Sequence, residues 1–116
     1  MTTPVSIDFA QHDGIPVATV RGEIDLSNIA DVRAAIAGAM TNASRALIVD
    51  LSETTYMDSR GIHLLFELAE RLARSQQQFL VVVPADSPIR KLLLITHLEQ
   101  VAVILDSVGA AVAQID

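Results

Sequence analysis

The chain has 116 residues, of which 51% are hydrophobic and none is cysteine, and its formal net charge is −6. This length and hydrophobic content predict one globular domain with its own core rather than a disordered segment. The acidic balance argues against binding to nucleic acid or to an anionic membrane surface, and the lack of cysteine excludes disulfides and thiolate metal sites.

The N-terminal segment predicts an antiparallel hairpin over residues 5–22. Apolar and polar side chains alternate from Val5 to Phe9, with the two-residue period of a strand. The turn-forming letters HDG follow at 12–14, and a second strand pattern, IPVATVRGEI, begins at Ile15. No basic segment followed by an apolar core opens the sequence, so no signal peptide is expected. No apolar run approaches the roughly 20 residues of a membrane span.

Strand and helix patterns alternate along the rest of the chain. Continuous apolar runs indicate buried strands, and periodic apolar positions behind a capping residue indicate helices. The resulting order, ββαβαβαβα, predicts an α/β fold in which four helices pack on a mixed, mostly parallel sheet. The predicted strands are 46–51, 78–84 and 101–105, and the predicted helices are 28–40, 60–74, one begun by Ser87 and Pro88, and 106–115.

Polar residues follow two strands of this predicted sheet. The strand–helix–strand unit implies that strands 15–22 and 46–51 run parallel, with their carboxyl ends at one edge. Asp25 follows the first of these strands, and Ser59 follows the second. Because binding sites in such sheets form at this edge, we expect Asp25 and Ser59 to be neighbours there. Asn28 is expected to cap the helix that begins after Asp25.

The residues around Ser59 leave three interpretations open: a helix cap, a nucleophile or a phosphate acceptor. Either Ser59 or Asp58 would contribute about 1 kcal/mol as a cap. A hydrolase elbow reads G-x-S-x-G, and here its first glycine is missing, while His63 falls on the polar stripe of the helix. Gly61 lowers helix propensity but leaves first-turn N–H groups accessible to an anion. The three histidines have no metal-site spacing, so neither a metal nor a cofactor is expected.

Three segments of the chain resemble the anti-sigma factor antagonist family, the STAS domains. They are VRGEID at 20–25, LIVDLSETTYMDSRGIHLL at 47–65 and SPIRKLL at 87–93, and the similarity extends over the whole chain, 1–116. In that family, a partner kinase, the anti-sigma factor, phosphorylates the serine of a D-S-x-G motif. The unphosphorylated form binds this kinase and releases a sigma factor, phosphorylation breaks the complex, and a phosphatase resets it.

The resemblance implies that Ser59 is the phosphorylation site. It also implies a cytoplasmic protein that regulates transcription by binding a protein and is not itself an enzyme. The alternatives are a ligand- or nucleotide-sensing STAS module, a scaffold subunit of a signalling complex and, less readily, a small serine hydrolase. The residues expected to contact the partner are Asp25, Asn28, Asp58, Arg60, Gly61 and His63.

Two positions depart from the family pattern. The residue after the serine is usually small, and here it is Arg60, which would pair with the phosphate or bias the choice of kinase. The third helix usually ends in glycine, and here His97 takes that place. Leu93, Leu94 and Ile95 make this helix apolar nearly all round, and we expect the C-terminal helix to cover them, with an exposed contact surface as the alternative.

Overall fold

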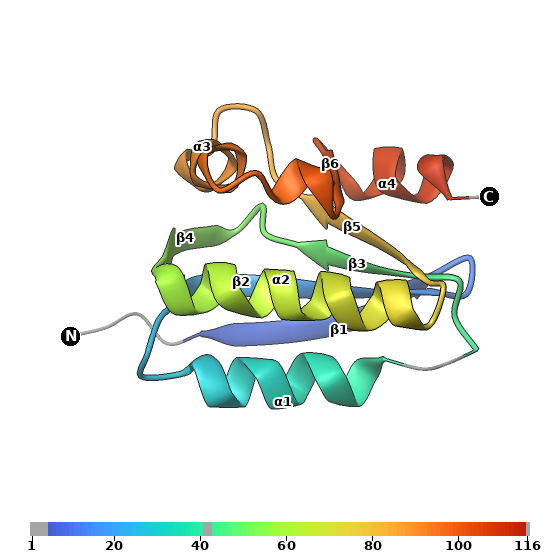
Figure 1. Ribbon diagram of the computed structural model, residues 1–116, viewed down its shortest axis with the longest axis horizontal. Coiled ribbons are helices and arrows are strands. Elements are labelled where there is room, and N and C mark those ends of the chain that lie inside the picture. The colour runs from blue at the N-terminus through green and yellow to red at the C-terminus, as the bar shows by residue number, and fades with distance from the viewer. Residues whose placement is uncertain (1–4, 41–42, 116) are drawn as a thin grey trace.

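A mixed sheet carries helices on both of its faces in the computed structural model, which describes residues 5–40 and 43–115 (Figure 1). The elements in chain order are β1 (Ser6–His12), β2 (Ile15–Ile24), α1 (Ile29–Ala39), β3 (Ala46–Asp50), β4 (Thr54–Met57), α2 (Ser59–Arg74), β5 (Gln78–Val82), α3 (Pro88–Ile95), the 3₁₀ helix η1 (Leu98–Gln100), β6 (Val103–Leu105) and α4 (Val108–Gln114). The strand order is β1-β2-β3-β5-β6, and β4 pairs with β2 outside this row. Among the described strands, only the β1–β2 pair is antiparallel, so the predicted α/β fold with a mixed, mostly parallel sheet is confirmed.

The predicted N-terminal hairpin is present and closes with a two-residue turn. His12 pairs with Ile15, and the two residues between them have positive φ angles, 54° at Asp13 and 80° at Gly14. Tight hairpin turns of this kind need positive φ at both central positions, which Asp-Gly accommodates. The letters around the turn therefore set the register of β1 on β2.

Strand β4 is the element that the sequence pattern does not predict. The first half of β2 pairs with β3, where Val17 lies opposite Ile48, and its last residues pair with β4. The change of partner falls at Gly22, whose φ is 99° and after which the register shifts. The buried Thr54 hydroxyl donates to the Val20 carbonyl over 2.8 Å and holds the start of β4 against β2. The predicted order therefore lacks one strand, and Ser59 follows β4 rather than β3.

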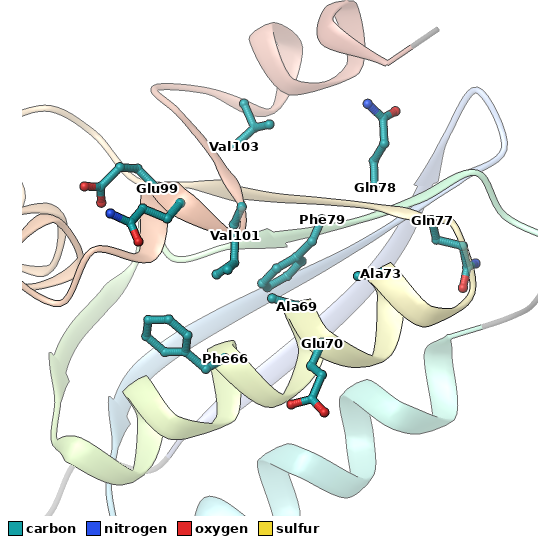
Figure 2. Close-up of a pocket in the computed structure, with 12 residues that line it drawn as sticks. Phe66, Ala69, Glu70, Ala73, Gln77, Gln78, Phe79, Glu99, Val101 and Val103 are labelled. Carbon is teal, nitrogen blue, oxygen red and sulfur yellow. The ribbon is translucent and has the colours of Figure 1, made fainter.

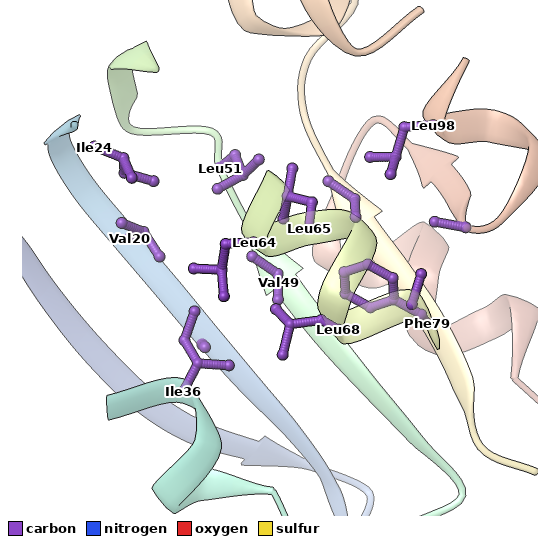
Figure 3. Close-up of a cluster of buried hydrophobic side chains, with 14 of the residues drawn as sticks. Val20, Ile24, Ile36, Val49, Leu51, Leu64, Leu65, Leu68, Phe79 and Leu98 are labelled. Carbon is purple, nitrogen blue, oxygen red and sulfur yellow. The ribbon is translucent and has the colours of Figure 1, made fainter. Parts of the chain in front are cut away.

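The core consists of two clusters, one on each face of the sheet. In the larger cluster, side chains of α1, α2, α3 and η1 pack on β2, β3 and β5 (Figure 3). The smaller cluster lies on the other face, where α4 packs on the sheet around Ala111. Neighbouring residues of β3 enter different clusters, Val49 the larger and Ile48 the smaller. The strand is thus buried on both faces, as its continuous apolar run predicts.

The third helix, α3, differs from expectation on its outer side. Leu93 is buried in the larger cluster, but Leu94 and Ile95 are 45% and 64% exposed, so the expectation that the C-terminal helix covers them is wrong. The reason is that α4 packs on β3, β5 and β6 instead. His97 has a φ of 62°, in the left-handed region that favours glycine at the end of a helix. Within the described ranges, every helix is too short or too polar to cross a bilayer.

Candidate functional site

The ends of β2 and β4 bring Asp25 and Ser59 to one edge of the sheet, as predicted. The Asp58 amide donates to the Ile24 carbonyl over 3.1 Å. In return, the Leu26 amide donates to Asp58 Oδ2 over 3.2 Å. These two bonds tie the loop that contains Asp25 to the residue before Ser59. In Figure 1, the starts of α1 and α2 and the end of β4 meet at this edge.

Asp58, and not Ser59, caps helix α2. Its Oδ1 atom accepts a hydrogen bond from the Arg60 amide over 2.8 Å. Its carbonyl accepts from the amides of Gly61 and Ile62 over 3.1 and 3.3 Å. The expectation that first-turn amides are open to an anion is therefore wrong for these three residues. The cap interpretation of Ser59 is wrong as well.

Ser59 is the first residue of α2, and its side chain is exposed. Within the described part of the chain, its hydroxyl makes no hydrogen bond. Within the described residues, a modification of this hydroxyl would therefore break no hydrogen bond, and the oxygen is accessible from solvent.

Gly61 is a packing residue rather than an accessible one. A Cβ atom at this position would lie 2.4 Å from Met57 Cγ and 3.2 Å from Ile24 Cγ2. The missing side chain therefore lets the first turn of α2 approach β4 and β2. Because Gly61 is buried, we correct the expectation that it contacts a partner directly.

Asn28 precedes α1 but does not cap it with its side chain. Its Oδ1 accepts from the Asp25 amide over 3.0 Å, and its Nδ2 donates to the Glu23 carbonyl over 2.7 Å. The Asp25 carboxylate accepts from the Ser27 amide over 2.9 Å. Both predicted site residues therefore hold the shape of the loop between β2 and α1. The expected Asn28 cap is wrong, because its side chain binds backward to this loop.

A groove between α1 and α2 adjoins Ser59 and has cationic walls. Its volume is about 410 Å³, and it is lined by Ile29, Arg33, Ser59, Arg60 and His63. Arg33 Nε and Nη2 lie 3.1 and 3.2 Å from the two carboxylate oxygens of Glu67. His63 Nε2 lies 3.1 Å from Glu67 Oε1. The predicted residues Arg60 and His63 thus share one groove with Ser59.

Three residues of the site are missing from the sequence-based set. Arg33 belongs to the site because α1 packs beside α2, and no local sequence pattern predicts that packing. Leu26 and Tyr56 are large apolar side chains, 65% and 50% exposed, on the loop and strand that flank Asp58. A hydrophobic residue directly after Asp25 was the available sequence signal for Leu26. Exposed apolar side chains beside a polar centre are typical of protein-binding surfaces.

The geometry gives no support to a hydrolase mechanism. Among the described residues, no hydrogen bond joins Ser59 to His63, which pairs instead with Glu67. An oxyanion hole needs donors that are free to bind the developing charge. The amides of Arg60 and Gly61 already bind Asp58.

A second groove, of about 730 Å³, lies away from the Ser59 edge (Figure 2). It runs between α2, β5 and the segment that leads into β6. Aromatic and small apolar side chains form much of its wall, and carboxylates and amides stand among them. The lining residues are Phe66, Ala69, Glu70, Ala73, Gln77, Gln78, Phe79, Glu99, Gln100, Val101, Ala102 and Val103.

The chain resembles known proteins in both its sequence and its fold. The STAS domain family model matches residues 6–111. The anti-sigma-F factor antagonist RsfB from two strains of Mycobacterium tuberculosis is 31% identical over 71 residues, which make up 61% of this chain and 58% of that protein. The chain thus matches less than two thirds of the length of these relatives.

Solved structures with the same architecture include an anti-sigma factor antagonist from Mycobacterium paratuberculosis. It is 25% identical, the alignment covers 99% of this chain and 98% of that one, and the TM-score is 0.87. The anti-sigma factor antagonist SpoIIAA in its unphosphorylated form is 19% identical, with 93% of each chain covered and a TM-score of 0.74. The Bacillus protein SpoIIAA in its phosphorylated form is 20% identical, with 94% and 98% covered and a TM-score of 0.70. At these identities the two SpoIIAA structures show a shared fold.

Proposed function

The chain belongs to the STAS domain family, and we propose that it is an anti-sigma factor antagonist controlled by phosphorylation of Ser59. Its unphosphorylated form binds an anti-sigma factor that is a serine kinase and so frees a sigma factor in the cytoplasm. A phosphatase acting on phospho-Ser59 restores this form. The observation that carries the proposal is the exposed Ser59 hydroxyl, which makes no hydrogen bond within the described residues because Asp58 caps the helix.

The partner surface proposed for the unphosphorylated form surrounds Ser59. Leu26 and Tyr56 supply apolar contact area on either side of Asp58, and Arg60 and His63 supply exposed polar groups. Asp25 and Asn28 keep the adjoining loop in shape, and Asp25 and Asp58 contribute negative charge. This combination of apolar anchors and a charged surround supports a protein partner over a small-molecule substrate.

The charge on a phosphoserine explains how the complex would be lost. Phosphate adds about −1.5 to −2 charges beside Asp58, on a chain whose net charge is already −6. A partner seated over Ser59 would have to desolvate this group next to another anion, at a cost of several kcal/mol. Each 1.4 kcal/mol is a tenfold change in affinity, so the complex dissociates without any change of fold.

Incubation with ATP and a candidate anti-sigma kinase tests the proposal. Intact mass should increase by one phosphate, and peptide mapping should place it on Ser59. Ser59→Ala should bind the kinase and resist release, whereas Ser59→Asp should bind weakly. Ser107→Ala is the matched control, since Ser107 lies in a second D-S-x-G string and should not affect phosphorylation. Phosphate at another residue, together with full binding by Ser59→Asp, would exclude the mechanism.

The groove in Figure 2 supports a second candidate, the ligand-sensing STAS module. Its walls around Phe66, Phe79 and Val101 suit a small apolar molecule. Among the described residues, no Lys or Arg lines it, which disfavours the phosphates of a nucleotide. A compound that binds there should raise the melting temperature of the wild type. Ala73→Leu, which fills the groove, should abolish that rise and leave Ser59 phosphorylation intact; a persistent rise would place the ligand elsewhere.

A further inference from the structure

The first turn of α2 cannot accept a phosphate on Ser59 through the amides of Arg60, Gly61 and Ile62, because all three bind Asp58. We propose that the chain instead binds the phosphate of phospho-Ser59 in the groove between α1 and α2, through Arg33, Arg60 and His63. This inference rests on the proposed phosphorylation of Ser59. It goes further by assigning the phosphate a site on this chain and three side chains that hold it.

The geometry of the groove places Arg33, Arg60 and His63 around the serine. Ser59 and His63 are four residues apart, so they lie on the same face of α2. Arg33 reaches the groove from α1, and Arg60 follows Ser59 directly. Three of the five lining residues can therefore carry positive charge. The exposed Ser59 side chain opens into this space rather than toward the core.

Glu67 is the anion that Arg33 and His63 contact in the unphosphorylated chain. It receives a two-point contact from Arg33 and a third contact from His63. His63 lies four residues from Ser59 on one side and four from Glu67 on the other, within reach of both. A phosphate carries more charge than a carboxylate and offers three acceptor oxygens, and the guanidinium fork of arginine suits it. Phosphorylation would therefore draw Arg33 and His63 from Glu67 toward residue 59.

The anions near the site oppose this binding and must be included in the balance. Asp58 directly precedes Ser59, Asp25 lies on the adjoining loop, and Glu67 competes for two of the cations. Arg33, Arg60 and His63 face the groove itself, whereas the Asp58 carboxylate is turned toward the amides of Arg60 and Leu26. We therefore expect the attraction between the phosphate and Arg33, Arg60 and His63 to outweigh the repulsion from the nearby carboxylates. Cations favour the doubly charged form, so the second pKa of the phosphate should fall below its usual value of about 6.

Phosphorus NMR on a chain with phosphoserine built in at position 59 during translation tests the inference without a kinase. The titration midpoint of the phosphate should lie about 1 pH unit below that of a phosphoserine peptide, the low end of the roughly 1 to 3 units that a neighbouring opposite charge causes, because the groove is open to solvent. Arg33→Gln should return at least half of this shift. Arg33 suits this test because its charge does not change during the titration. Arg45→Gln is the control, since it removes an exposed arginine outside the groove.

Two further variants test the same inference through the same titration midpoint. His63→Gln should also move the midpoint toward the peptide value, and Arg33→Lys, which keeps the charge but loses the fork, should return part of the shift. Circular dichroism verifies that each variant is folded. A midpoint equal to that of the peptide, or one that ignores both Arg33→Gln and His63→Gln, would overturn the inference. The proposed switch fails separately, if no anti-sigma kinase modifies Ser59 even though the translated phosphoserine shows the shift.

Discussion

The string D-S-x-G occurs twice in this chain, and its two copies are built differently. At residues 106–109, Ser107 caps α4 by accepting a hydrogen bond from the Ala110 amide over 3.1 Å. At residues 58–61, Asp58 is the cap, and the serine is left without a hydrogen bond within the described residues. The start of α3 has Asp-Ser as well, and there too the serine caps, at Ser87.

Contacts outside the string account for the difference. Gly61 presses against Met57 and Ile24, and Asp58 is bonded to the backbone on both sides of Asp25. By contrast, the nearest atom to a Cβ built at Gly109 is Ser107 Oγ, at 3.9 Å. In the string at 58–61, the helix thus begins one residue earlier than in the string at 106–109, because Asp58 and Gly61 contact the neighbouring strands. Ser59 is therefore the first residue of the helix and does not cap it. A short motif therefore acquires its function from the surface on which the helix begins.

The largest expected effect is a difference in stability between substitutions of Gly61 and Gly109. Gly61→Ala should lower the free energy of unfolding by about 2 kcal/mol, because the new methyl group overpacks against Met57. Gly109→Ala should instead raise it by up to about 1 kcal/mol, because alanine favours the helix and the space is open. Urea denaturation of both variants measures the difference. Equal effects of the same sign would show that the packing at Gly61 does not distinguish the two copies.

The second-largest expected effect is a difference in stability between substitutions of Asp58 and Asp106. Asp58→Ala removes the cap of α2 and the acceptor of the Leu26 amide, and should cost about 1.5 kcal/mol. Asp106→Ala removes only an ion pair with Arg90 in which the aspartate is largely exposed, and should cost less than about 1 kcal/mol. Thermal unfolding of the two variants measures which substitution lowers the stability more. The comparison breaks down if Asp106 proves the more costly residue to remove.

The smallest effects concern the serines themselves. Ser107→Ala loses a side-chain cap and should cost about 1 kcal/mol. Ser59→Ala loses no hydrogen bond within the described residues and should remain within about ±0.5 kcal/mol of the wild type. Chemical denaturation of both variants measures these changes. A loss of about 1 kcal/mol for Ser59→Ala would mean that the serine caps in solution, which would weaken the case for an unoccupied phosphate acceptor.

The sequence by itself determined the hairpin, the alternation of strands and helices and the family. Asp-Gly specifies the turn at 13–14, and the apolar run of β3 requires burial on both faces, since these are local or composition-driven effects. The resemblance at 47–65 also led to the STAS family, which the family model confirms. Because parallel strands end at one edge, the sequence also placed Asp25 and Ser59 at the same edge of the sheet, although Ser59 reaches it after β4 and not after β3.

Only the tertiary structure decided which residue begins α2 and which cations reach Ser59. Asp58 and Ser59 are equally good caps by residue type, and the choice depends on the bonds of Asp58 to Ile24 and Leu26. Strand β4 is too short for a period of two to be visible, and it exists because it pairs with β2. Arg33 joins the site only through the packing of α1 beside α2. Each of these depends on contacts between residues far apart in the chain, which no local pattern of letters records.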